Sequence, residues 1–298
     1  METSEYIHDK ANVAIESDDH WTEIIRPKSS LFDIRLREVW RYRDLVMMFV
    51  KRDIVANYKQ TILGPIWIFL QPIMTSLMYV LVFGKIAGIS TDGIPMMAFY
   101  LSGVMLWSYF SECFNKTATV FKDNASIFGK VYFPRLVMPL ALVISNLVKL
   151  LIQFGLFLIV WGYYLYMGKV HPNMYMLLFP LLIMLLAGIS LGIGMIISSL
   201  TTKYRDLIFL LTFGIQLFMY ATPVIYPLSV VHNKYPKMEA VIKANPLTPI
   251  METFRKGFLG TGDFSWAWLA YSAVFTLVLM AVGTVIFNRV EKNFMDTV

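Results

Sequence analysis

Two ionisable residues, Glu112 and Lys149, stand out within long apolar stretches of the 298-residue chain, and the polar Gln153 is grouped with them. A charge inside a membrane is costly, so it is usually paired or in contact with water. One alternative is a polar path through the membrane. The other, which we favour, is an ion pair between neighbouring helices or, for Glu112, closeness to the membrane surface. Two charges are too few for a proton relay.

The sequence lacks the short motifs of several catalytic chemistries. No G-x-x-x-x-G-K-[ST] phosphate loop is present, so we expect no ATP bound in that manner. The four histidines lack metal-ligand spacing, and no G-x-S-x-G elbow or paired-carboxylate signature is found. The single cysteine, Cys113, excludes an internal disulfide framework. We therefore predict no enzyme activity, no metal and no cofactor bound by this chain.

Composition points to a membrane protein. Residues of hydrophobic type make up 57% of the chain and charged residues only 15%, against about 25% in a typical soluble domain. The net charge of +6 could suggest nucleic acid, but the basic residues are distributed as they would be along a membrane surface. The N-terminus has no apolar core of the signal-peptide kind. We predict an all-α integral membrane protein that binds no nucleic acid.

Six segments are long and apolar enough to cross a bilayer, which takes about 20 residues as helix. They are residues 66–86, 96–114, 140–167, 174–200, 207–226 and 266–287. The predicted organisation is a polar N-terminal extension (1–30), an interface helix (31–60), a transmembrane domain (61–290) and a short tail (291–298).

Orientation follows from the basic residues that flank these segments. Eighteen of the 26 lysines and arginines fall on the side of the N-terminus, six fall on the other side and two lie within the segments. Because basic residues concentrate on the cytoplasmic side, both termini are predicted to be cytoplasmic.

Residues 31–58 predict an amphipathic helix with at most one break. Trp40, Met47, Val50 and Ile54 belong to its apolar stripe, while Lys51 and Arg52 project elsewhere. Such a helix lies in the membrane interface and directs basic side chains towards lipid phosphates. A protein partner beneath it is a compatible second role. The following Leu63-Gly64-Pro65 is expected to form the corner into the first span.

Two connections between the spans are informative. Residues 115–135 are mildly basic and are expected to contain a short helix, about 117–128, which is either an ordinary loop or a lever moved by a cytoplasmic subunit. Residues 227–265 are semi-apolar, with an amphipathic stretch from Pro249 to Phe258. Their apolar side chains need burial, so we predict two short re-entrant helices, which would shape an exit or form a lid.

Small and aromatic residues complete the pattern. The small residues at 187, 188, 192, 194 and 198 predict close helix contacts, within one subunit or between two. Aromatic side chains near the span ends fit interfacial belts. A minority could line a sugar path, and the candidates are Trp67, Tyr79, Trp107, Phe213, Tyr220 and Tyr226.

Several motifs together resemble one family, the ABC-2 type permeases of polysaccharide export. The matching residues, in order, are Arg52-Asp53, Tyr58-Lys59-Gln60-Thr61, Leu63-Gly64-Pro65, Trp67, Gln71-Pro72, Lys130-Val131-Tyr132-Phe133-Pro134-Arg135, Met138-Pro139-Leu140, Tyr204-Arg205-Asp206, Thr222-Pro223-Val224-Ile225-Tyr226, Asn245-Pro246 and Arg255. The resemblance covers about residues 31–290. The N-terminal extension departs from the family pattern, and its role is open.

The resemblance implies a homodimer of six-helix subunits in the bacterial cytoplasmic membrane, paired with two copies of a separate ABC nucleotide-binding subunit that binds ATP and Mg²⁺. The implied cargo is a polyprenyl-pyrophosphate-linked glycan, with O-antigen preferred over teichoic acid or capsule. The implied coupling residues are Arg52, Asp53, Lys122, Asp123, Lys130, Arg205 and Asp206. The basic inner surface, represented by Arg52, Lys59 and Arg135, would meet the lipid pyrophosphate.

Three other classes remain as alternatives. An ABC-2 drug or lipid exporter is disfavoured by the interface helix and the Leu-Gly-Pro-x-Trp corner. A membrane glycosyltransferase or acyltransferase would need clustered acidic or histidine residues. A secondary transporter would show internal repeats and helix breaks in matching spans.

Overall fold

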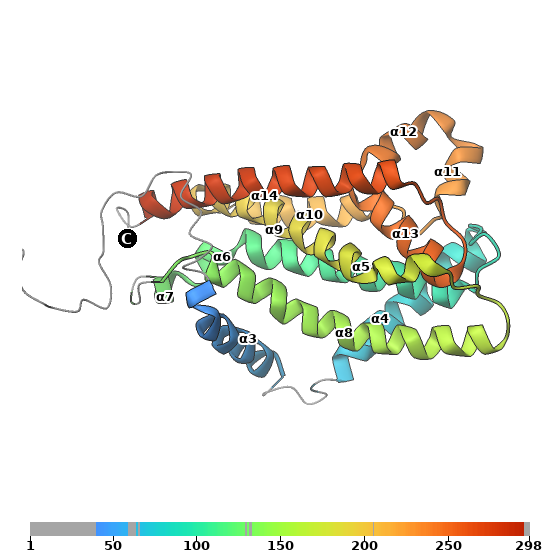
Figure 1. Ribbon diagram of the computed structural model, residues 1–298, viewed down its shortest axis with the longest axis horizontal. Coiled ribbons are helices and arrows are strands. Elements are labelled where there is room, and N and C mark those ends of the chain that lie inside the picture. The colour runs from blue at the N-terminus through green and yellow to red at the C-terminus, as the bar shows by residue number, and fades with distance from the viewer. Residues whose placement is uncertain are drawn as a thin grey trace, which may run out of the picture. The chain divides into compact units, whose positions relative to one another are not determined.

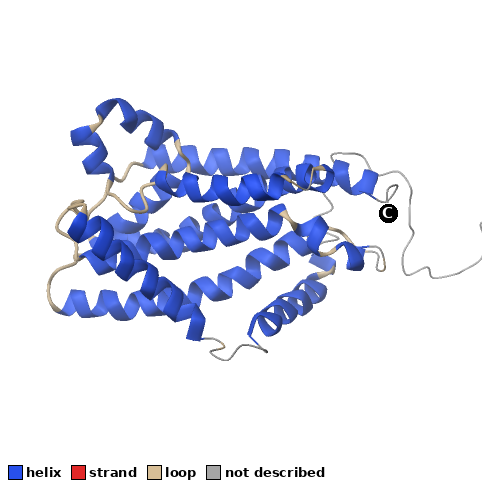
Figure 2. Cartoon of the chain, turned by 180° about the vertical axis from the view of Figure 1, so that it is seen from behind, coloured by secondary structure: helices blue, strands red, loops and turns tan. Residues whose placement is uncertain are grey.

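The computed structural model describes residues 40–58, 64, 66–128, 130, 133–204 and 206–294. The predictions for the N-terminal extension, for residues 31–39, for Lys59 and for Arg205 therefore lie outside the described residues. Helices make up all the regular structure of the described part (Figure 2). In chain order they are α3 (Arg43–Tyr58), α4 (Ile66–Tyr79), η2 (Val80–Ile86), α5 (Met96–Ala118), α6 (Val120–Asp123), α7 (Ala125–Phe128), α8 (Val137–Tyr166), η3 (Met174–Leu178), α9 (Phe179–Lys203), α10 (Leu207–Tyr220), α11 (Leu228–Lys234), α12 (Pro236–Ala244), α13 (Leu247–Leu259) and α14 (Trp266–Phe294).

Each predicted span coincides with helix, although the spans differ in length and apolarity. Among the described residues, four helical segments are long and apolar enough to cross a membrane: Ile66–Ile86, Val137–Tyr166, Met174–Thr201 and Trp266–Val290. Helix α5 has 23 residues but carries more polar and aromatic side chains. The prediction that the fifth span reaches residue 226 was wrong, because α10 ends at Tyr220 and a turn begins before Pro223, whose nitrogen cannot donate a helical hydrogen bond.

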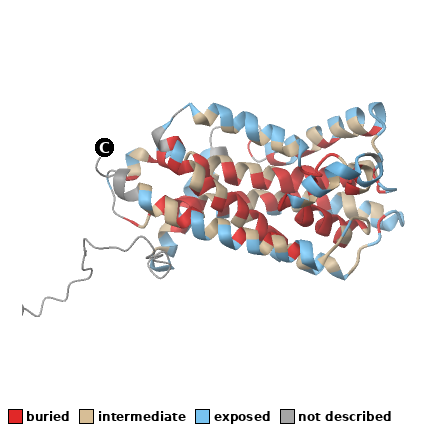
Figure 3. Ribbon diagram, turned by 90° about the horizontal axis from the view of Figure 1, so that it is seen from above, coloured by how far each residue is buried: buried red, intermediate tan, exposed pale blue. Residues whose placement is uncertain are grey.

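Helices α5, α9 and α14 form the core, and α9 runs beside α14 (Figure 1). The buried residues gather in the interior of the helical assembly, and the exposed ones lie along its outer helices and at its ends (Figure 3). Glycines set the spacing: a Cβ on Gly283 would lie 2.6 Å from the carbonyl oxygen of Gly192, and one on Gly194 would lie 2.6 Å from Cβ of Thr117. The small-residue stripe of the fourth span therefore packs within the subunit, against α14 and α5.

Helix α3 packs against α8, but its buried face differs from the predicted stripe. Val46, Phe49 and Val50 are buried, whereas Trp40 and Met47, which were predicted to share the apolar face, are 72% and 63% exposed. Helix α3 thus carries apolar side chains on two faces: one packs against α8, and the other, with Met47, is exposed in the chain alone, so its contact with the membrane interface stays a prediction. Beyond α3, Gly64 has a φ of 46°, which confirms the prediction that glycine serves an unusual backbone angle at this corner.

The two informative connections lie at opposite ends of the long helices (Figure 1). At one end, α6 and α7 fill the 115–135 connection, where one short helix had been predicted. At the other end, the 227–265 segment holds three helices, α11 to α13, instead of the predicted two. Helix α13 is buried along almost its whole length and contacts α5, α9, α14 and η3.

Candidate functional site

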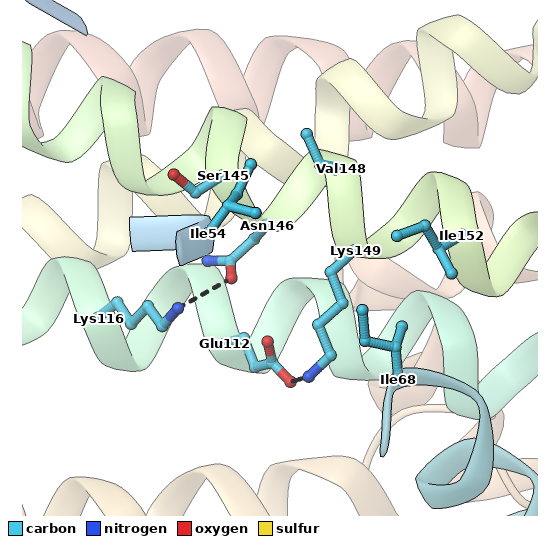
Figure 4. A pocket seen from close by; sticks show the side chains of 9 residues that line it. All are labelled: Ile54, Ile68, Glu112, Lys116, Ser145, Asn146, Val148, Lys149 and Ile152. Atoms are coloured by element: carbon cyan, nitrogen blue, oxygen red, sulfur yellow. Dashed lines mark hydrogen bonds and ion pairs between the residues drawn. The ribbon is translucent and has the colours of Figure 1, made fainter. Parts of the chain in front are cut away.

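A cavity of about 310 Å³ lies between α3, α4, α5 and α8 (Figure 4). We call it the Lys116 pocket. Its polar lining consists of Glu112, Lys116, Ser145, Asn146 and Lys149. Its apolar lining comes from Ile54, Ile68, Val148 and Ile152. Because these residues belong to four separate helices, the pocket exists only when the interface helix and the spans are assembled.

Two contacts cross the pocket from α5 to α8. Lys149 forms an ion pair with Glu112, and the two side chains are 22% and 28% exposed. Of the alternatives left open for these residues, the ion pair between neighbouring helices is thus present. Lys116 Nζ donates to Asn146 Oδ1 at 3.2 Å. Gln153, grouped with them from sequence, does not line the pocket and is buried on α8.

A second polar cluster surrounds Arg255 on α13, and we call it the Arg255 centre. The guanidinium is 2% exposed and donates to Glu252 Oε1 at 3.1 Å and to the carbonyl of Val224 at 2.8 Å. Its Cζ lies 3.8 Å from the ring centroid of Phe99 on α5, a cation–π contact. Glu252 Oε2 accepts from the backbone N–H of Asp263 at 3.1 Å. Both charges are therefore paired and hydrogen-bonded although they are buried.

The Arg255 centre fixes the turn that follows α10. Asn245 Nδ2 donates to Thr222 Oγ1 at 2.9 Å, and Arg255 holds the next part of the same turn through Val224. A Cβ on Gly103 would lie 2.7 Å from the Val224 carbonyl oxygen, so α5 must present glycine at this point. The Thr222–Tyr226 turn is thus held by side chains from two later segments, Asn245 and Arg255, which explains why these residues occur together in the sequence pattern.

The predicted coupling residues that the structure describes lie within α3, on α6, after α7 and before α10. Arg52 pairs with Asp53 at 2.7 Å on α3, and Lys122 and Asp123 are exposed on α6. Asp123 Oδ2 accepts from Thr119 Oγ1 at 2.6 Å. Lys130 is exposed after α7, and Asp206 is exposed directly before α10.

Arg135 differs from its predicted place on a basic inner surface. It is 3% exposed, and its guanidinium carbon lies 5.3 Å from the ring centroid of Phe128. The structure therefore places Arg135 inside the connection and not at a surface that an incoming diphosphate would meet. With Lys59 outside the described residues, Arg52 is the exposed member of the predicted lipid-pyrophosphate group.

The candidate pore aromatics separate into exposed and enclosed side chains. Trp67, Phe213 and Tyr220 are at least half exposed, which in a membrane helix means contact with lipid or with another subunit. Trp107 is 8% exposed and lies against Phe110 and Phe218. The remaining two are held by hydrogen bonds. Tyr79 donates to Met219 Sδ at 3.4 Å, and Tyr226 donates to the carbonyl of Tyr220 at 2.9 Å.

A row of aromatic rings connects the elements at the α6–α7 end, and we call it the inner aromatic row. It runs from Phe49 on α3 through Phe133, Phe128 and Phe121 to Phe287 on α14. Successive ring centroids are 5.7, 5.7, 5.7 and 4.6 Å apart. A displacement of α3 would therefore be transmitted through close-packed side chains to the connection and to α14.

Among the residues that the structure describes, no group of three or more His, Cys, Asp and Glu side chains is arranged to hold a metal ion. The part of the chain that the structure describes is all-helical, and its long apolar helices are those of an integral membrane protein. The family model described as ABC-2 type transporter matches residues 44–259. The chain belongs to this family.

Curated relatives match nearly the whole length of the chain. The O-antigen export system permease protein RfbA of Myxococcus xanthus is 27% identical over 266 residues, which cover 89% of this chain and all of that protein. RfbA of Klebsiella pneumoniae is 25% identical, covering 85% and 94% of the two chains. The capsule polysaccharide export inner-membrane protein CtrC of Neisseria meningitidis is 24% identical, covering 81% and 89%.

Sequence reasoning missed three features of the site. Asn146 was not singled out, the pairing of Arg255 with Glu252 was not predicted, and the inner aromatic row was not recognised. A signal existed for Arg255 alone, because Glu252 lies three residues earlier on the amphipathic stretch, a spacing that brings two side chains together on a helix. Asn146 and the aromatic row depend on contacts between distant segments.

Proposed function

We propose that the chain is the permease subunit of an ABC transporter that exports a polyprenyl-pyrophosphate-linked polysaccharide across the bacterial inner membrane. The observation that carries this proposal is the match to an O-antigen export permease over the full length of that protein. O-antigen is the first candidate cargo. Capsular polysaccharide and teichoic acid are the alternatives, and the similarity to capsule export proteins keeps the former in view.

The proposal includes an assembly. Two copies of this chain, each with six spans and cytoplasmic termini, would pair with two copies of a separate nucleotide-binding subunit that binds ATP and Mg²⁺. The end of the molecule that carries α3, α6 and α7 would face that subunit. Helices α11 to α13 would then lie at the outer side, with α13 as a re-entrant helix; its burial against α5, α9 and α14 supports this placement.

The inner aromatic row favours the lever over the ordinary loop for residues 115–135. Phe121, Phe128 and Phe133 are each at most 4% exposed and link α3 to α14, so the connection is in direct contact with the two helices between which a lever would pass a movement. Closure of the nucleotide-binding subunits would push on α3 and α6, and the row would pass this movement to the spans. A pore between the two permease copies would open, with exposed aromatics such as Trp67, Phe213 and Tyr220 available to sugar rings.

The coupling surface is tested by reversing one charge on it. Lys122→Glu should reduce co-purification of the nucleotide-binding subunit about tenfold or more, because reversing a charge at an interface replaces an attraction by a repulsion. The matched control is Lys169→Glu, which reverses the charge of an exposed lysine just beyond the far end of α8. It should leave capture of the nucleotide-binding subunit unchanged. Equal capture by both variants would reduce the connection to a loop.

The function itself is tested in the cell that carries this chain. Removal of the chain should abolish one surface polysaccharide and cause the corresponding polyprenyl-linked glycan to accumulate on the cytoplasmic side. Gel electrophoresis of the surface glycans identifies which polymer is lost, and re-expression of the chain should restore it. Surface polysaccharides of normal amount and length in the deletion strain would contradict the proposal.

A further inference from the structure

The Lys116 pocket contains N–H donors that lack a strong hydrogen-bond acceptor among the described residues. Asn146 is 3% exposed, and its Nδ2 has no oxygen or nitrogen acceptor among the residues that the structure describes. The thiol of Cys113 lies beside this amide, but sulfur is a weak acceptor. Figure 4 shows the Asn146 amide directed into the pocket, with its oxygen facing Lys116. An amide donor buried in this way costs free energy unless an acceptor arrives.

The charges around Asn146 favour an anionic acceptor. An ammonium group has three N–H donors. The contacts described here give Lys116 Nζ one acceptor, on Asn146, and Lys149 Nζ one acceptor, on Glu112. Two lysines face one carboxylate across the pocket, so its net charge is positive. An oxygen-rich anion could accept from Lys116, from Asn146 Nδ2 and from the remaining donors of Lys149.

The apolar part of the lining indicates that this anion is attached to a lipid. Ile54 and Ile68 come from the interface helix and the first span, and Val148 and Ile152 continue the apolar surface along α8. Glu112 and Lys149 are partly exposed, so the pocket is accessible from outside the chain. A head group at Lys116 would thus have hydrocarbon-compatible side chains next to it.

We propose that the Lys116 pocket binds a phosphate group carried by a membrane lipid, with Lys116 and Asn146 as the principal donors. Insofar as the lipid is the polyprenyl diphosphate of the cargo, the assignment rests on the proposed function. Glu112 has a defined part in this site: it neutralises Lys149 and limits how tightly the phosphate is held, which suits a site that must also release its ligand.

Native mass spectrometry of the purified full-length chain tests the site, with undecaprenyl diphosphate and phosphatidylglycerol as separately titrated probes. Lys116→Met should weaken binding of the phosphate lipid about tenfold or more, as expected for a lost charge-assisted hydrogen bond. Asn146→Asp, which is nearly isosteric, should weaken binding by a similar factor because it adds a negative charge. Arg289→Gln, which removes one exposed charge from α14, is the control and should bind like the unmodified chain.

Glu112→Gln separates a ligand site from a structural polar cluster, because the two roles predict opposite signs. A phosphate site predicts binding that is roughly three- to tenfold tighter once the competing carboxylate is gone. A cluster that only holds α5 to α8 predicts weaker binding, or none, in both Glu112→Gln and Lys116→Met. Thermal unfolding of each variant shows which of them remain folded. If Glu112→Gln does not fold, the binding measured with Asn146→Asp provides the test instead.

The two probes identify the source of the phosphate. Undecaprenyl diphosphate bound at least tenfold more tightly than phosphatidylglycerol, with dependence on Lys116, supports the cargo head group. Equal, Lys116-dependent binding of both lipids supports a phosphate site for ordinary membrane lipid and removes the cargo assignment. Binding that Lys116→Met leaves unchanged overturns the proposal. The binding assay does not depend on export. A failure of the phosphate-site proposal is therefore distinguishable from a failure of the proposed function, which would show as normal surface polysaccharide in the deletion strain.

Discussion

The Arg255 centre and the Lys116 pocket each bring a basic side chain and a glutamate together, but they differ in how completely their polar atoms are satisfied. At the Arg255 centre both charges are at most 3% exposed, and the guanidinium has a carboxylate, a backbone carbonyl and a ring as neighbours. At the Lys116 pocket the ion pair is partly exposed, and a buried amide nitrogen has only the weakly accepting thiol of Cys113 beside it. The first arrangement is typical of a cluster that stabilises the fold, and the second is consistent with the proposed phosphate-binding site.

The largest expected effect is at the Arg255 centre. Arg255→Met should lower the free energy of unfolding by about 3–5 kcal/mol, because it leaves Glu252 buried without its cation. The double variant Glu252→Met/Arg255→Met should be less destabilised than Arg255→Met alone, since no buried charge remains. Thermal unfolding of the purified protein in detergent measures both. A single variant that unfolds like the unmodified protein would remove the distinction between the two regions.

A smaller effect is expected from the same kind of change at the Lys116 pocket. Lys149→Met should lower the free energy of unfolding by less than Arg255→Met does, because the Glu112 carboxylate that it leaves unpaired is 28% exposed and is therefore not fully desolvated. The same unfolding assay applies, so the two regions are compared directly. A loss as large as that of Arg255→Met would mean that the Glu112–Lys149 pair stabilises the fold as well.

The smallest expected effect concerns the pH dependence of helices α11 and α12. The ammonium of Lys243, hydrogen-bonded at 2.8 Å, and His232 hold the pKa of the Glu239 carboxyl below its usual range. Because the folded-state pKa is lowered, this pair stabilises α12 at pH values above the ordinary glutamate pKa, and the contribution is lost as pH falls through the lowered value. Hydrogen exchange should therefore show α12 opening in acid.

A variant isolates the Glu239 contribution. Glu239→Gln should make hydrogen exchange in α12 less dependent on pH in the acid range, while Asp44→Asn, at an exposed aspartate of α3, should not. If α12 in Glu239→Gln responds to acid as the unmodified chain does, another group is responsible for the effect.

The sequence predicted the helices well, because apolar length and flanking charge are local signals. The helices that begin at Ile66, Val137 and Trp266 start within a few residues of the predicted spans 66–86, 140–167 and 266–287. Gly64 adopts its expected backbone angle. The predicted end of the fifth span failed because apolarity continues through Val224 and Ile225 after the helix has stopped. Apolar residues bury equally well in a turn, provided that its carbonyls find donors, and here Arg255 supplies one.

The sites were harder to predict because their members come from separate elements. Glu112 and Lys149 could be singled out, since a charge within an apolar segment is visible in one dimension. Asn146 could not, because an uncharged amide in a long helix is unremarkable until its missing acceptor is known. The packing of α3 was hard to predict for a related reason: apolar residues occupy two of its faces, and only tertiary contacts show which face meets α8.

The central claim, that this chain is the permease of a polysaccharide exporter, is tested most directly by gentle purification of the tagged chain from native membranes, followed by mass spectrometry of the proteins and lipids that accompany it. We predict a stoichiometric ATPase subunit with a Walker phosphate loop and a polyprenyl-linked glycan. Recovery of the chain alone, or with ordinary phospholipid as its only companion, would contradict the account.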